Sequence, residues 1–126
     1  MRNINSPKEQ LDNLTNDLID PLAFDLANKV SWHYINGFSK SNNDLYPIVL
    51  TGEGPPLLMI HGFDSCFLEF RRLVPLLRDK YKLIIPDLYG FGFCPRPKSE
   101  DYGMESIVSH LTKILGILNP KSPIGV

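Results

Sequence analysis

Residues 57–60 read Leu-Leu-Met-Ile, an apolar run that no polar residue interrupts. A strand with one face in water alternates apolar and polar side chains, whereas a strand buried on both faces does not. Residues 81–86 form a second short apolar strand segment, and residues 107–118 carry apolar side chains at helical spacing. Because strands buried on both faces are joined by helices, the sequence predicts an α/β fold with a mostly parallel sheet.

Two further strands are predicted before the buried run, at residues 30–35 and 46–51. The stretch between them is small and polar, which is typical of a hairpin loop, so we expect an antiparallel first hairpin. After the buried run, residues 67–77 carry apolar side chains at helical spacing and predict a helix. The helix at residues 107–118 should end at Asn119-Pro120, and residues 124–126 resemble the start of one more strand.

The N-terminal segment is predicted to be helical. Ser6 and Glu9 have the spacing of a capping box, and Pro7 occupies the first helical position. Leucines then recur at helical intervals until Pro21, which should break the run and start a second short helix. We interpret residues 1–29 as a helical N-terminal extension packed outside the main domain, and residues 30–126 as a partial α/β domain.

Composition limits the partners. The chain has 13 basic and 14 acidic residues and no Lys/Arg cluster, which argues against nucleic acid and against an anionic membrane surface. Its longest apolar runs are far too short to span a bilayer. Residues 1–10 lack the apolar stretch of a secretory signal, and the two cysteines, Cys66 and Cys94, are expected to be free thiols. These observations predict a cytoplasmic protein.

The first candidate site is the cluster of residues 61–64, His-Gly-Phe-Asp, directly after the buried strand. Ligands bind at the carboxyl ends of strands in open parallel sheets. Gly62 should let the chain turn sharply and leave backbone N–H groups unpaired, as half of an oxyanion hole requires. Asp64 or Ser65 would then cap the helix that starts near Cys66. An ordinary strand-to-helix turn is the alternative interpretation.

The second candidate site follows the next strand, at residues 87–93. Asp87 stands at the strand end, and an aspartate near glycines can hold a tight loop through bonds to backbone groups. Gly90 and Gly92 are spaced as in a phosphate loop. That interpretation fails, because Pro95 stands where the third glycine of a dinucleotide fingerprint belongs and no helix follows at once.

Together these clusters resemble the α/β-hydrolase superfamily. The features occur in the order and at the spacing of that family, over residues 46–126 and more weakly over residues 30–44. Four features carry the resemblance: Gly52-Glu53-Gly54-Pro55-Pro56, the apolar run at 57–60, His61-Gly62-Phe63, and Asp87-x-x-Gly90-Phe91-Gly92.

The resemblance implies a role for each residue of the first cluster. Phe63 would supply a backbone N–H to the oxyanion hole, and His61 and Gly62 would shape the oxyanion loop. Phe63, Asp64 and Tyr89 would lie near the mouth of the substrate pocket. The resemblance implies no cofactor and no metal.

The second cluster would form a structural turn beside the active site. Asp87, Gly90 and Gly92 would build that turn without taking part in bond breaking. Cys94 is a departure, since serine is common at this position of the family.

The nucleophile of this family sits on a Gly-x-Ser-x-Gly turn after the fifth strand, and no such pattern occurs between residues 1 and 126. The acid and the histidine of the triad come later still. We therefore expect the chain to be the N-terminal half of the domain, ending before the nucleophile. His33, His61 and His110 are interpreted as structural residues, and Cys66 as a residue of the core or the helix entry.

The leading hypothesis is a truncated, cofactor-free hydrolase of ester-like or similar small-molecule bonds. A Ser-His-Asp type triad from the missing C-terminal half would complete it and admit a small-molecule substrate. The alternative is a non-catalytic half-domain that pairs with a complementary second chain or acts as an interaction module. A nucleotide-binding fold fits the strand-helix alternation but lacks a glycine fingerprint after a strand.

Overall fold

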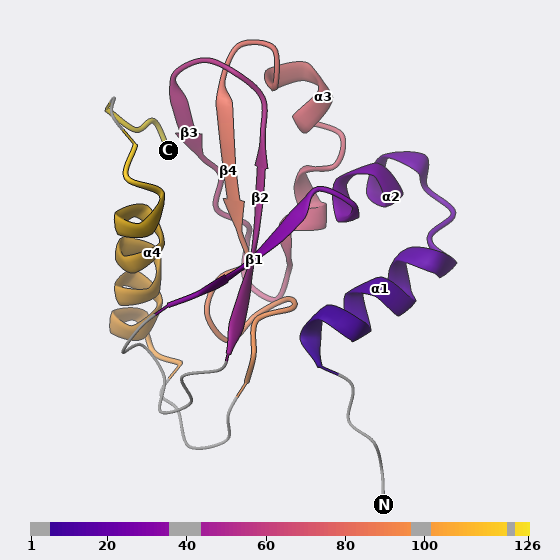
Figure 1. The fold of residues 1–126 in the computed structure, drawn as a ribbon, viewed down its shortest axis with the longest axis horizontal. Coiled ribbons are helices and arrows are strands. Elements are labelled where there is room, and N and C mark those ends of the chain that lie inside the picture. The colour runs from indigo at the N-terminus through magenta and orange to yellow at the C-terminus, as the bar shows by residue number, and fades with distance from the viewer. Residues whose placement is uncertain (1–5, 36–43, 97–101, 121–122) are drawn as a thin grey trace, which may run out of the picture.

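A computed structural model describes residues 6–35, 44–96, 102–120 and 123–126 (Figure 1). The predicted hairpin loop and the C-terminal part of the glycine-rich turn fall partly outside the described residues. The elements follow in this order: α1 Pro7–Asp17, α2 Pro21–Ala27, β1 Val30–Tyr34, β2 Leu45–Thr51, β3 Pro56–Leu58, the 3-10 helix η1 Phe67–Phe70, α3 Val74–Leu77, β4 Lys82–Pro86 and α4 Met104–Leu118.

The sheet has four strands in the order β1-β2-β4-β3. β1 and β2 form the predicted antiparallel hairpin, β2 is also antiparallel to β4, and β3 runs parallel to β4. On the other side of β3, Leu57 forms a parallel bridge with Gly125. Leu58 N donates to Gly125 O over 2.8 Å, so the C-terminal segment does begin to pair as a further strand. The predicted α/β class and the antiparallel first hairpin are confirmed, but the four described strands form a mixed sheet, because only β3 and β4 pair in parallel.

Two apolar clusters cover the two faces of the sheet, with α4 on one side and α1, α2 and η1 on the other (Figure 1). Side chains along β4 alternate between the clusters, Leu83 and Ile85 in the first and Ile84 in the second. All three are at most 1 % exposed, so β4 is the strand buried on both faces. The run at 57–60 departs from its prediction, because β3 ends at Leu58 and Ile60 is 40 % exposed.

The N-terminal helices begin where the sequence predicts. Ser6 Oγ accepts from the Glu9 N–H, and Glu9 Oε2 accepts from the Ser6 N–H, each over 3.2 Å. However, Leu11 and Leu26 belong to the same buried cluster as Val49 of β2. The expectation that these helices pack outside the domain is therefore corrected, since they share its core. The boundary at residue 29 stays a prediction.

Residues 67–77 do not form the single predicted helix. η1 is followed by a turn and then by the one-turn helix α3. Pro75 explains the interruption, because it has no N–H to donate to the carbonyl of Arg71. The chain uses the tighter bonds of a 3-10 helix there, such as Leu73 N to Phe70 O over 3.0 Å.

α4 begins at Met104, before the predicted stripe at residues 107–118, and ends where predicted, at Asn119, whose φ of 44° is left-handed. His110 and Ile114 are fully buried toward the sheet, but Val108 of the predicted apolar stripe is 54 % exposed. Among the described residues, no helix combines the length and apolarity needed to cross a membrane.

Candidate functional site

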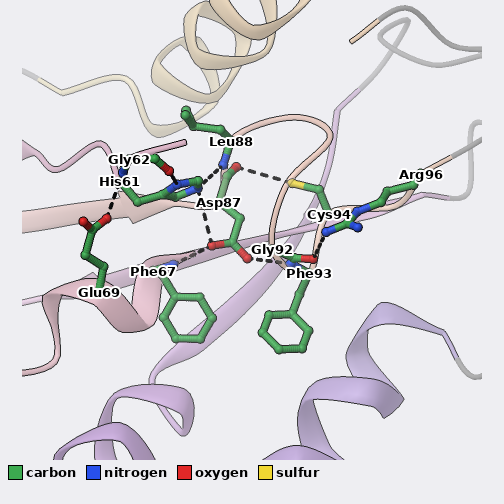
Figure 2. Close-up of polar contacts among 10 residues, drawn as sticks. All are labelled: His61, Gly62, Phe67, Glu69, Asp87, Leu88, Gly92, Phe93, Cys94 and Arg96. Atoms are coloured by element: carbon green, nitrogen blue, oxygen red, sulfur yellow. Dashed lines mark hydrogen bonds and ion pairs between the residues drawn. The ribbon is translucent and has the colours of Figure 1, made fainter. Parts of the chain in front are cut away.

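The two clusters predicted from the sequence meet at the carboxyl ends of β3 and β4 (Figure 2). The backbone N–H of Leu88 donates to His61 Nε2 over 2.9 Å, which joins the loop after β3 to the loop after β4. His61 is 3 % exposed and Asp87 is fully buried. The parallel pairing of the two strands brings these loops together, because parallel strands end at the same edge of a sheet.

The hydrogen bonds of His61 assign its tautomer. A backbone N–H can only donate, so Nε2 must be the acceptor and carries no hydrogen. The ring hydrogen therefore sits on Nδ1, which lies 2.8 Å from the Gly62 carbonyl oxygen and donates to it. The imidazole is neutral in this arrangement. Its Nε2 lies 4.0 Å from Asp87 Oδ1, too far for a hydrogen bond, and the pair is not an ion pair.

The bond from His61 fixes the direction of the following peptide group. The Gly62 carbonyl and the Phe63 N–H belong to one trans peptide, and they point in opposite directions. Because the carbonyl faces the His61 ring, the Phe63 N–H faces away from it. None of the described residues accepts a hydrogen bond from the Phe63 N–H.

Asp87 ties three segments together (Figure 2). Its Oδ1 accepts from the Phe67 N–H and its Oδ2 from the Phe93 N–H, each over 2.7 Å. Its carbonyl oxygen lies 3.3 Å from the Cys94 thiol, which donates to it. Asp87 therefore caps η1, and the prediction that Asp64 or Ser65 would do so is wrong, because no side chain caps η1 from its own N-terminus.

Burial dominates the electrostatics of this turn. Burial raises the pKa of the Asp87 carboxyl above its usual value, and the N–H groups of Phe93 and Phe67 act in the opposite direction. Burial also raises the pKa of the Cys66 thiol, and it raises that of the Cys94 thiol well above the usual value. Neither thiol is therefore set up as a nucleophile at neutral pH.

Gly90 and Gly92 have φ angles of +89° and +57°, in the left-handed region that favours glycine. A Cβ at Gly92 would lie 2.3 Å from Asp87 Oδ2, so this residue passes directly against the carboxylate. Gly62, by contrast, does not have a left-handed φ. The residue with a left-handed φ in that loop is Asp64, at +57°.

An open hollow of about 520 Å³ lies between the segment after His61 and the glycine-rich turn. Phe63, expected at a pocket mouth, is not among the lining residues, and its ring is exposed. That ring lies edge-on to Phe91, with ring centroids 5.3 Å apart. Asp64 lines the hollow, and its place at the mouth of a substrate pocket stays a prediction. The full lining is Asp64, Ser65, Cys66, Gly90, Phe91, Gly92, Phe93 and Arg96.

Tyr89 does not line that hollow. It is 1 % exposed and packs in the cluster under α4, with its ring centroid 5.6 Å from that of His110. The expectation that Tyr89 lies at a pocket mouth is corrected, because the turn directs its side chain to the α4 face of the sheet.

The sequence did not predict two contacts of the site. Glu69 Oε2 accepts from the Gly62 N–H over 2.8 Å, and Arg96 Nη2 donates to the Gly92 carbonyl over 2.7 Å. The sequence holds one sign of the first contact, because Glu69 is a charged residue between Leu68 and Phe70 in an otherwise apolar stretch. In the part of the chain that the structure describes, no three His, Cys, Asp or Glu residues gather closely enough to hold a metal ion.

Comparisons with known proteins show which proteins this chain resembles. A family model described as the alpha/beta hydrolase fold matches residues 55–126. The 2-hydroxy-6-oxo-2,4-heptadienoate hydrolase of Pseudomonas putida is 39% identical over 70 residues, 53% of this chain and 25% of that protein. Lipase 1 of Psychrobacter immobilis is 45% identical over 62 residues, 49% of this chain and 19% of that protein.

Solved structures give a similar result. A meta-cleavage product hydrolase from Pseudomonas fluorescens IP01 superimposes with a TM-score of 0.58 at 35% identity, over 64% of this chain and 31% of that chain. The chain spans about a quarter of the length of the curated relatives it matches.

Proposed function

Because this chain belongs to the α/β-hydrolase fold family, we propose that it forms the oxyanion side of a hydrolase active site. The substrate would be a small molecule with an ester-like or similar carbonyl bond. The observation that carries the proposal is the Phe63 N–H, which the His61 contact with the Gly62 carbonyl turns away from the His61 ring. A donor fixed in this way needs no reorganisation when charge develops on a substrate oxygen.

Attack on a carbonyl carbon turns its oxygen into an oxyanion. The Phe63 N–H would donate to that oxygen, while His61 polarises the same peptide by donating to its carbonyl. Removal of one such donor typically lowers kcat by about 10²- to 10³-fold. His61 would therefore position the donor. The Leu88 N–H would support this role of His61, because its bond to Nε2 keeps the ring hydrogen on Nδ1, which donates to Gly62.

The remaining catalytic groups would come from residues outside these 126. None of the three histidines is available as the general base. His61 bonds to the backbone of Gly62 and Leu88, His33 bonds with Ser31, and His110 is buried between α4 and the sheet. A parallel strand continuing from Gly125 would end beside residues 61–63, because Gly125 pairs with β3. The nucleophile elbow of this fold follows such a strand, so a serine there would face the Phe63 N–H.

An activity-based label tests this proposal. A fluorophosphonate reacts with an activated serine, so it should modify the natural full-length protein on a peptide outside residues 1–126. The same protein should hydrolyse short-chain p-nitrophenyl esters. A label within residues 1–126 would contradict the assignment. Absence of both labelling and hydrolysis, with a second chain co-purifying, would favour the non-catalytic half-domain instead.

A further inference from the structure

A second side chain besides His61, that of Glu69, holds the oxyanion loop. Glu69 Oε2 lies 2.8 Å from the backbone nitrogen of Gly62 and accepts its hydrogen bond (Figure 2). We propose that Glu69 is a positioning residue, which restrains Gly62 so that the next peptide presents the Phe63 N–H to the substrate. This inference rests on the proposed function.

Gly62 needs such a restraint. Glycine has the greatest backbone freedom of all residues, and Gly62 is exposed. With the Glu69 contact, both polar groups of Gly62 are held, its N–H by Glu69 and its carbonyl by His61 Nδ1. With the His61 contact alone, Gly62 would be held only at its carbonyl, and its N–H would have no restraint.

Glu69 is itself well anchored, because both ends of its segment are fixed. Before it, the Phe67 N–H is bonded to the buried carboxylate of Asp87. After it, Arg71 Nε donates to Asp20 Oδ2 at the start of α2 over 2.8 Å. A contiguous set of contacts therefore runs from the N-terminal helices through η1 to the oxyanion loop.

The negative charge of Glu69 has an effect on the oxyanion opposite to that of its hydrogen bond. A carboxylate near an oxyanion repels it, whereas the hydrogen bond orients the donor. Glu69 is exposed to water, which screens the repulsion, so the orienting effect should dominate. Glu69→Gln separates the two effects, because the amide oxygen still accepts from Gly62 while the charge is gone.

The test compares Glu69→Ala and Glu69→Gln with a matched control, Glu53→Gln, in the natural full-length protein. Glu53 is also exposed but lies in the turn that precedes β3, at the opposite end of that strand. With a p-nitrophenyl ester, Glu69→Ala should lower kcat about ten- to hundredfold with KM nearly unchanged. Glu69→Gln should stay within about threefold of wild type, as should the control.

A second readout does not depend on turnover. The amide proton of Gly62 should shift upfield in the NMR spectrum of Glu69→Ala, because it loses a charge-assisted bond. A kcat for Glu69→Ala within twofold of wild type, a Glu69→Gln variant as slow as Glu69→Ala, or an unmoved Gly62 amide would each overturn the inference. An inactive wild type with a shifted Gly62 amide would instead overturn the proposed function.

Discussion

Gly92→Ala tests how tightly the turn after β4 is packed against Asp87. The new Cβ would lie 2.3 Å from Asp87 Oδ2 and 2.5 Å from Cγ, where an ordinary contact begins at 3.4 Å. The carboxylate would have to move by about 1 Å. Its bond to the Phe93 N–H, now 2.7 Å, would then be broken.

Two effects set the magnitude. A non-glycine residue at a φ of +57° costs about 1–2 kcal/mol. A lost hydrogen bond to a charged group costs about 1.5–3 kcal/mol more. Gly92→Ala should therefore lower the free energy of unfolding by about 3–5 kcal/mol.

Gly62→Ala is the matched control. Its Cβ would meet Glu69 Oε1 at 3.7 Å, an ordinary contact, and its φ is not left-handed. Its effect on stability should stay within about 0.5 kcal/mol. Urea unfolding followed by circular dichroism measures both variants. Free energies of unfolding within about 1 kcal/mol of each other would refute the reasoning.

Three further predictions concern a buried histidine, an exposed glycine of α4 and the two thiols. Burial lowers the pKa of His110 to about 4, so in acid the unfolded chain binds a proton that the folded chain refuses. The free energy of unfolding should therefore fall as the pH drops from 6.5 to 4. In urea titrations, His110→Phe should remove up to about 3 kcal/mol of that fall. The same pH dependence in His110→Phe as in wild type would contradict this. Gly116→Ala adds a Cβ with nothing within 4 Å, so it should stabilise α4 by about 0.5–1 kcal/mol, seen as a higher Tm; a lower Tm would count against it. Iodoacetamide should modify Cys66 before the buried Cys94, and peptide mass spectra showing the reverse order would disprove the assigned burial.

Local features of this fold could be predicted from the sequence because their partners are close along the chain. Ser6 and Glu9 are three residues apart, and Asp20 caps α2 by accepting from Leu22. The apolar runs likewise located β4 and α4. Pro75 shows where periodicity misleads, since the apolar spacing continues through a residue that cannot join the helical ladder.

The candidate site was only partly predictable, because its contacts join backbone groups to distant side chains. Asp87 accepts from Phe67, twenty residues earlier, and His61 from the backbone of Leu88, twenty-seven residues later. A backbone N–H leaves no trace in the choice of residue, so neither partner is visible in the sequence. The position of the Tyr89 side chain also depends on the backbone conformation of the turn. The identity of the residue alone does not reveal that conformation.

The central claim is that the backbone N–H of Phe63 stabilises an oxyanion. Incorporating phenyllactic acid at position 63 of the natural full-length protein tests it directly, because an ester oxygen replaces that N–H and the side chain is kept. Phe63→Ala is the control, since it keeps the N–H and removes the ring. We predict that the ester lowers kcat by about 10²- to 10³-fold, while Phe63→Ala changes it far less. A kcat for the ester variant within about threefold of wild type would contradict the claim.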